Sequence, residues 1–271
     1  MSTQKPKAQA PGGPEDDVEM GFFEHIGELR TRLMRAIYGL VPAVFLTWAY
    51  KEKLLDIIFE PLRKAWIARH FQGAPSVHFA NPVDAFMANM QVALIAGLVL
   101  ASPWMFWQLW AFVSPGLYRK EKLLALPFVL VSTIFFVGGV VFGYLIVFPM
   151  GLGELFAFAG TLPSGMTVTP TIMVDAYLDL ATRMLLAFGV VFEVPVIVTF
   201  LALADIVTWR QLLQFSRWWL VVASILSAVL TPPDVASQMM MLIPLVVLYM
   251  ISVGIAMLVQ IPRSRKAKAA D

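Results

Sequence analysis

The sequence contains no cysteine and few charged residues. The absence of cysteine excludes disulfides, thiolate metal sites and a cysteine nucleophile. Charged residues make up 14% of the 271 residues, whereas a soluble globular protein carries roughly 25%. Hydrophobic residues reach 59% of the chain. This composition predicts an all-α membrane protein that crosses the bilayer several times.

Signals of enzyme chemistry are also scarce. The three histidines, His25, His70 and His78, are scattered and do not have the spacing of a metal site. The sequence has no glycine-rich phosphate loop, and a net charge of +2 is too small to suggest nucleic acid. We therefore expect no catalytic residues, no metal, no cofactor and no nucleic-acid partner.

Apolar segments of membrane-spanning character recur along the chain and predict six transmembrane helices. They are residues 33–50, 83–113, 123–148, 176–204, 215–230 and 239–259. Pro149 is expected to end the third segment. The fifth segment spans only about 24 Å at 1.5 Å per residue, short of a hydrocarbon core of roughly 30 Å.

The segments outside the spans divide the chain further. Residues 1–20 are rich in Pro, Gly and charge and are expected to form a disordered tail. Residues 21–260 form the membrane domain, and residues 261–271 a basic tail. An amphipathic pattern over residues 51–68 predicts an interfacial helix in the first outer loop, broken near Pro61. Residues 71–82 are turn-rich and are expected to be extended.

Lys and Arg are concentrated in the loops on one side, which predicts that both termini are cytoplasmic. Two of the three outer loops carry no Lys or Arg, and a helix lying on the membrane surface would explain the cations of the other. Those cations are Lys51, Lys53, Arg63, Lys64 and Arg69.

One carboxylate lies inside an apolar run. Glu193 is enclosed by residues 185–198, and such a charge costs about 2.5–3.5 kcal/mol at bilayer depth. Pro195 lacks an N–H and leaves the carbonyl of Val191 unbonded. The pattern indicates a polar docking or proton-handling point, and the alternative is a protonated Glu that is hydrogen-bonded between helices. In the same segment, Asp179 and Arg183 are four residues apart and are expected to pair.

Five motifs occur in order at matching membrane depths. They are HIGELRTRL at 25–33, WAFVSPGLYRKE at 110–121, VFP at 147–149, AFGVVFEVP at 187–195 and LTPPD at 230–234. Together they resemble the TatC family, the multispanning receptors of the twin-arginine protein translocase. The resemblance extends over nearly the whole chain, from about residue 21 to 259.

The resemblance implies a receptor that exports folded proteins, driven by the proton gradient without a nucleotide. It implies a multi-pass protein of the cell inner membrane. The implied partners are signal peptides with two adjacent arginines, the single-span proteins TatA and TatB, and other TatC copies.

The resemblance also implies roles for individual residues. Glu28 and Glu121 match the acids that meet the arginine pair, and Glu193, with its neighbours Phe192 and Pro195, matches the intramembrane site where partners dock. Pro61 and Asp234 match residues of the outer face. The other implied signal-peptide-binding residues are Leu29, Arg30, Arg32, Phe112, Pro115, Leu117 and Tyr118. The chain departs from the family pattern at Asp84, where Glu is more frequent, and at Gln91, where many members carry Lys.

The physical argument beside the resemblance concerns Glu28 and Glu121. A guanidinium pair requires planar carboxylate acceptors, and both acids are predicted at helix ends on one membrane surface. The alternative for each is a solvated ion pair worth under about 1 kcal/mol. For the whole chain, the alternatives are a proton-coupled small-solute transporter that uses Glu193 and, less favoured, a membrane hydrolase.

Overall fold

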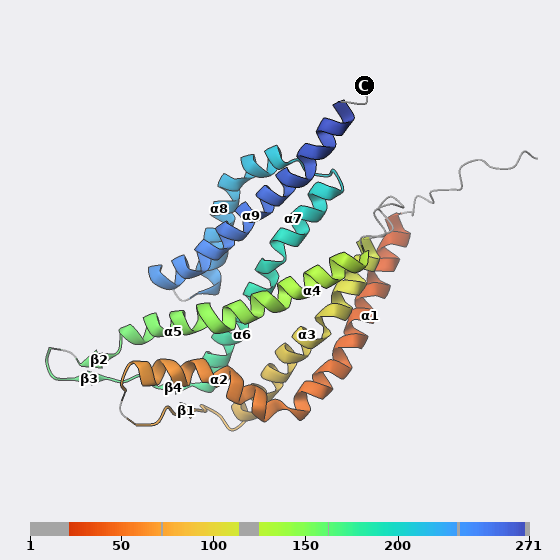
Figure 1. The fold of residues 1–271 in the computed structure, drawn as a ribbon. Helices are drawn as coiled ribbons and strands as arrows, with labels where there is room; N and C mark the ends of the chain where they lie inside the picture. The colour runs from red at the N-terminus through yellow and green to blue at the C-terminus, as the bar shows by residue number, and fades with distance from the viewer. Residues whose placement is uncertain (1–21, 72, 114–124, 162, 232–233, 269–271) are drawn as a thin grey trace, which may run out of the picture.

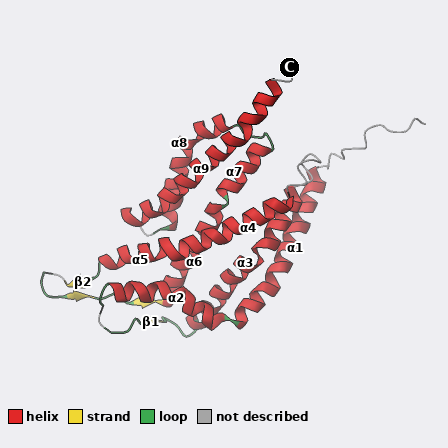
Figure 2. Cartoon of the chain, viewed as in Figure 1, coloured by secondary structure: helices red, strands yellow, loops and turns green. Residues whose placement is uncertain are grey.

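The computed structural model describes residues 22–71, 73–113, 125–161, 163–231 and 234–268. Helices account for most of these residues, as the composition predicts (Figures 1 and 2). In the first half of the chain they are α1 (Phe22–Ala49), α2 (Lys51–Ala68), α3 (Asp84–Val113), α4 (Ala125–Phe142), the π-helix η3 (Gly143–Val147) and α5 (Phe148–Ala157). In the second half they are α6 (Val174–Phe192), α7 (Val194–Leu203), α8 (Trp209–Leu230) and α9 (Val235–Lys268).

Four two-residue strands lie near α2 and the end of α5 (Figure 1). Strand β1 (Val77–His78) pairs in parallel with β4 (Ile172–Met173), with Val77 opposite Ile172. Strand β2 (Gly160–Thr161) pairs antiparallel with β3 (Thr167–Val168). The expected extended segment 71–82 therefore contributes β1 and ties the chain after α2 to the chain before α6.

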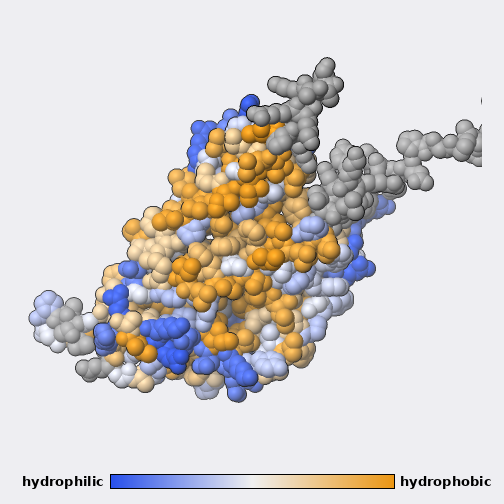
Figure 3. Space-filling model, in the orientation of Figure 1, coloured by the Kyte–Doolittle hydropathy of each residue, from blue (hydrophilic) through white to orange (hydrophobic). Residues whose placement is uncertain are grey.

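Five helical runs among the described residues are long and apolar enough to cross a membrane. They are 84–113, 126–157, 174–203, 209–230 and 235–261. Helices α1 and α2 meet at a bend of 80° and pass the same test only as a pair, so the described residues hold five spans, or six if that bent pair counts as one. Figure 3 shows hydrophobic residues over the middle of the visible face and hydrophilic residues gathered at the end that carries α2. We call that end the α2 face. The opposite end, where α1 begins and α3 ends, is the N-terminal face.

Several predicted boundaries differ from the structure for local reasons. Pro149 does not end the third span, because it occupies the first turn of α5, where an N–H has no helical partner. The fifth span begins at Trp209 rather than at residue 215, because Thr208 and Gln211 form a capping box. Its 22 residues reach about 33 Å, enough to cross the hydrocarbon core. Helix α2 has the predicted bounds but continues through Pro61.

Glycines allow two helix pairs to approach closely. A Cβ on Gly97 of α3 would lie 2.9 Å from the Cα of Val44 on α1, and one on Gly39 of α1 would overlap the ring of Trp104. Thr47 Oγ1 of α1 donates to the Ala93 carbonyl of α3 at 2.7 Å. In α4 and α6, a Cβ on Gly139 would overlap the Phe188 carbonyl. These contacts fix α1 against α3 and α4 against α6.

Two tyrosines hold α2 where Pro61 interrupts its hydrogen bonding. Pro61 has no N–H, so the Ile57 carbonyl four residues earlier loses its helical donor. Tyr144 Oη of η3 donates to that carbonyl at 2.7 Å, and Tyr177 Oη of α6 donates to the Ile58 carbonyl at 2.7 Å. The predicted break at Pro61 is therefore repaired by side chains from two other helices.

Candidate functional site

The start of α1 and the end of α3 meet at the N-terminal face. The rings of His25 and Phe112 stack with centroids 4.5 Å apart and an interplanar angle of 20°. Further along the same seam, Trp104 Nε1 donates to the Arg35 carbonyl at 2.8 Å. The two helices are antiparallel, so residues of α1 between 25 and 35 face residues of α3 between 112 and 104.

Glu28 lies in this seam and retains free acceptor capacity. Its Oε1 accepts from Arg32 Nη2 at 3.2 Å and from Nε at 3.4 Å. Its Oε2 is buried and has no hydrogen-bond partner among the described residues. The side chains of Glu28 and Arg32 are only 19% and 26% exposed. Leu29 and Arg30, on the outer side of α1, are exposed.

Part of the predicted signal-peptide site lies outside the described residues. Pro115, Leu117, Tyr118 and Glu121 belong to the segment 114–124, which begins one residue after α3 ends. Where this segment leaves α3, the structure stacks His25 on Phe112, and the paired Glu28 and Arg32 follow His25 along α1.

Gln108 is a buried polar residue that sequence reasoning missed. It is 3% exposed, and its Oε1 has no hydrogen-bond partner within the described part of the chain. It lies midway between Trp104 and Phe112, and residues four apart share one helix face. A glutamine on a face of α3 that otherwise carries large aromatic residues was the sequence signal for a polar site.

Glu193 forms the break between α6 and α7. It is the one residue between the two helices, and Pro195 lies in the first turn of α7. The side chain is 7% exposed, and Oε1 has no hydrogen-bond partner among the residues described. Its polar neighbours are the Ser132 side chain and the Phe136 backbone, both on α4. The carboxyl group thus turns toward α4 within the chain.

The surface around Glu193 is apolar and open. Val190 and Ile197, three residues before and four residues after Glu193, are 63% and 54% exposed. Phe192 packs on Phe142 with ring centroids 5.2 Å apart, and Pro195 is buried. The carboxyl group of Glu193 is enclosed. The backbone of Glu193, however, lies along an exposed apolar stripe that a further helix can cover.

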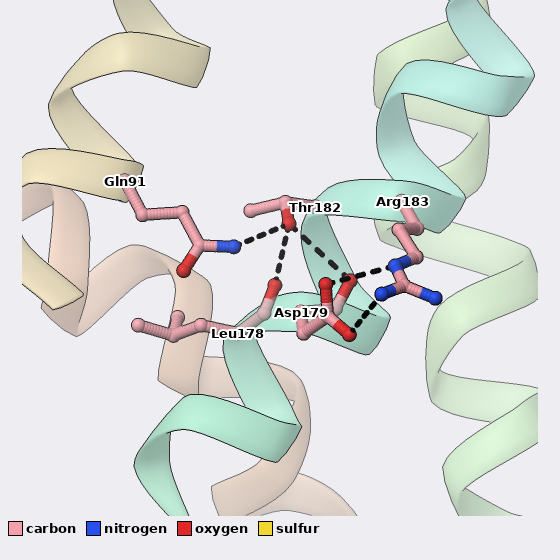
Figure 4. Close-up of polar contacts among 5 residues, drawn as sticks. All are labelled: Gln91, Leu178, Asp179, Thr182 and Arg183. Carbon is pink, nitrogen blue, oxygen red and sulfur yellow. Dashed lines mark hydrogen bonds and ion pairs between the residues drawn. The ribbon is translucent and has the colours of Figure 1, made fainter. Parts of the chain in front are cut away.

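A second polar group links α3 and α6 nearer the α2 face (Figure 4). Gln91 Nε2 donates to Thr182 Oγ1 at 2.9 Å, and Thr182 Oγ1 donates to the Leu178 carbonyl at 2.7 Å. The predicted pairing of Asp179 with Arg183 is confirmed: Arg183 Nε and Nη2 lie 2.8 and 2.7 Å from the two carboxylate oxygens. The two opposite charges of Asp179 and Arg183 therefore compensate each other on α6.

The two residues matched to the outer face have structural contacts. Pro61 is buried in α2 and is held by the tyrosine contacts described above. Asp234 Oδ1 accepts from the Ser237 backbone N–H at 2.7 Å at the start of α9, as an N-terminal cap does. Its Oδ2 and the Ser237 hydroxyl are buried and lack partners among the described residues.

Comparison with known proteins identifies the family. The profile of TatC, the Sec-independent protein translocase protein, matches residues 24–244. A TatC protein of Desulforapulum autotrophicum is 40% identical over 232 residues, which cover 86% of this chain and 82% of that protein. A TatC protein of Koribacter versatilis is 34% identical over 257 residues, covering 93% and 90% of the two chains.

A solved structure supports the same relationship. A crystal structure described as the twin-arginine translocase receptor TatC, in DDM, superposes with a TM-score of 0.76 at 30% identity. The match covers 86% of this chain and 99% of that one. Sequence and fold therefore agree, and the chain belongs to the TatC family of Sec-independent protein translocase proteins.

Proposed function

We propose that the chain is the receptor subunit of a twin-arginine translocase and binds twin-arginine signal peptides on its N-terminal face. One observation supports this most directly: Glu28 Oε2 is a buried carboxylate oxygen without a donor among the described residues. A buried acceptor left unsatisfied costs about 1–3 kcal/mol, or more when charged. An arginine side chain from a ligand supplies the missing donors.

The neighbourhood of Glu28 fits such a ligand. Phe112 and His25 form an aromatic contact beside it, and guanidinium groups stack on aromatic faces. Exposed Leu29 and Leu33 extend an apolar surface along α1 toward the membrane centre, where the apolar part of a signal peptide can pack. Glu121, in the segment that follows α3, is the proposed acceptor for the second arginine.

The proposed orientation places the N-terminal face and both termini in the cytoplasm. Helix α2 then lies on the outer membrane surface, with Lys51 and Lys53 near the aromatic rings of Trp48 and Tyr50. Trp and Tyr prefer the membrane–water boundary. In this orientation, the signal-peptide site is open to the cytoplasm, where cargo proteins are synthesised.

The proposed partners at Glu193 are the single-span proteins TatA and TatB, and further copies of this chain complete the assembly. A partner helix can cover the exposed Val190 and Ile197, and a polar side chain on it can hydrogen-bond Glu193 Oε1 once the carboxyl group turns away from α4. The chain acts as a receptor and scaffold rather than as an enzyme. The alternative of a small-solute transporter is not favoured, because family and fold are those of a protein translocase component.

Photo-crosslinking tests the proposed peptide site. A twin-arginine signal peptide is added to membranes carrying the chain with a photoreactive residue at Leu29 or Phe112. A matched probe at Ile57 of α2, which is also exposed, serves as the control. We expect crosslinks at Leu29 and Phe112 that an excess of unlabelled peptide removes. Equal crosslinking at Ile57, or none at the first two positions, contradicts the proposal.

A further inference from the structure

We infer that Gln108 is a specificity-determining residue of the signal-peptide site, whose side-chain carbonyl joins Glu28 Oε2 to bind one arginine guanidinium. The inference rests on the proposed function and goes beyond it by assigning a second acceptor on a different helix. It also gives a physical reason why arginine is preferred to lysine.

The register of α1 against α3 brings Gln108 to Glu28. His25 stacks on Phe112 at one end of the seam, and Gly39 accommodates Trp104 at the other. Gln108 is four residues from both Phe112 and Trp104, so it faces α1 at the level between His25 and Gly39. Glu28 and Arg32 are the half-buried polar side chains of α1 at that level.

The seam between α1 and α3 contains buried hydrogen-bond acceptors that lack donors in the described part of the chain. Arg32 is engaged by Glu28 Oε1. Glu28 Oε2 and Gln108 Oε1 both remain buried without a donor in the described part of the chain. Buried polar groups are normally paired, so two unpaired acceptors on facing helices indicate a site completed by a donor from outside the chain.

A guanidinium is the donor that fits best. It carries five N–H groups in a planar fork and can reach acceptors on two helices at once, whereas an ammonium is a compact point charge that is more strongly hydrated. Gln108 lies five residues before the end of α3, about 7 Å below the N-terminal face. An arginine side chain entering beside Glu28 is long enough to reach it.

The described part of the seam carries no net negative charge. Arg32 neutralises Glu28, and the cations Arg30 and Arg35 lie on the same helix. Gln108 is neutral, so its contribution is directional rather than electrostatic. Its removal should therefore reduce the preference for the planar guanidinium more than the general attraction of cations.

The test measures peptide affinity with the full chain in lipid nanodiscs. A fluorescent signal peptide with two arginines and the same peptide with two lysines are titrated against the wild type, Gln108→Leu and Gln108→Glu. Gln91→Leu is the matched control, because Gln91 is the other glutamine that α3 presents to a neighbouring helix, and it bonds Thr182 nearer the α2 face. Thermal unfolding of each variant reports on folding separately.

We expect Gln108→Leu to bind the arginine peptide about 10-fold more weakly, as for one hydrogen bond to a charged group. The affinity for the lysine peptide should change much less, so the ratio of the two affinities, which measures the preference for arginine, should fall. Gln108→Glu should bind the arginine peptide at least as tightly as the wild type. Gln91→Leu should bind both peptides with the affinities of the wild type.

The outcomes separate the inference from the proposed function. An unchanged arginine preference in Gln108→Leu overturns the assignment of Gln108 while leaving the peptide site in place. Equal weakening of both peptides also overturns it, because that indicates a structural effect. A wild type that binds neither peptide, or binds both equally, overturns the proposed function and the inference together.

Discussion

Tyr144 and Tyr177 show how single hydroxyl groups determine the position of a whole helix. Each donates to a consecutive carbonyl of α2 at the point where Pro61 removes a backbone donor. The sequence identified Pro61 as a helix breaker, and the local rule was correct. The structure differs because partners from distant positions supply the missing hydrogen bonds, which no local pattern reveals.

The first prediction at the residue scale concerns Tyr144. Tyr144→Phe leaves the Ile57 carbonyl without its donor and should destabilise the protein by about 1–2 kcal/mol. The measurement is thermal unfolding in detergent, with hydrogen exchange across 51–68 to locate the effect. Tyr38→Phe is the control, because Tyr38 is 66% exposed on α1. Equal stability and exchange in the two variants would contradict this role of the hydroxyl.

A second residue-scale prediction concerns Glu193. Glu193→Ala should keep signal-peptide binding but weaken association with a single-span partner, because one interhelical hydrogen bond is lost. Such bonds contribute roughly 0.6–2 kcal/mol, which corresponds to about 3- to 30-fold in affinity. Co-purification of the partner with the detergent-solubilised chain measures the effect. Wild-type co-purification in the variant would remove Glu193 from the docking site.

The residues of the candidate site were predictable only where charge or a motif marked them. Glu28, Phe112 and Glu193 are recognisable from the sequence, because acids and aromatic residues stand out at helix ends or inside apolar runs. Gln108 was missed, because a single neutral amide is a weak signal. Its proposed role depends on facing Glu28, which requires the register of two helices 80 residues apart in the sequence.

At the scale of elements, predicted spans were correct where hydrophobicity decides and wrong where hydrogen bonding at helix ends decides. The predicted bounds of α2 and α3 agree with the structure to within one residue, but the predicted start of α8 at residue 215 lies six residues after its observed start at Trp209. Thr208 and Gln211, which cap α8, lie in a stretch with two arginines and two glutamines that looks like a polar loop. Gln260 also supports this turn, because it accepts from Trp209 N–H and donates to two carbonyls.

Adjacent glycines of α4 test the close packing of α4 on α6. A Cβ on Gly139 would overlap the Phe188 carbonyl oxygen, whereas one on Gly138 meets nothing within 4 Å. Gly139→Ala should therefore destabilise the protein by about 1–3 kcal/mol through overpacking. Gly138→Ala should be neutral or stabilising by up to about 1 kcal/mol, because alanine favours the helix. Thermal unfolding of the two variants under identical conditions compares them, and equal effects would contradict the packing account.

At the scale of the whole molecule, the polar ends and the apolar middle define two faces. The N-terminal face carries the proposed peptide site, and the α2 face carries the strands, the tyrosine contacts and the Asp179–Arg183 pair. Because Glu193 joins α6 to α7 between these faces, a partner docked there contacts both the α4–α6 pair and the helices that follow. The proposed peptide site and the proposed docking site therefore lie on one connected framework of helices.

The orientation of the two faces can be measured with single cysteines, because the chain has none of its own. Ser164→Cys lies in the exposed turn between β2 and β3, and Ile206→Cys in the exposed turn between α7 and α8. In intact cells, a membrane-impermeant maleimide should label Cys at 164 but label Cys at 206 only after permeabilisation. The reverse pattern would place the N-terminal face outside and contradict the proposed topology.

The central claim is that the carboxylates of Glu28 and Glu121 bind the arginine pair of the signal peptide. The most direct measurement is the affinity of a twin-arginine signal peptide for the wild type, Glu28→Gln and Glu121→Gln in nanodiscs. Glu60→Gln is the control, since Glu60 forms ion pairs with Arg63 and Lys64 on the α2 face. We predict at least about 10-fold weaker binding for each of the first two variants and unchanged binding for the control. Wild-type affinity in Glu28→Gln would contradict the account.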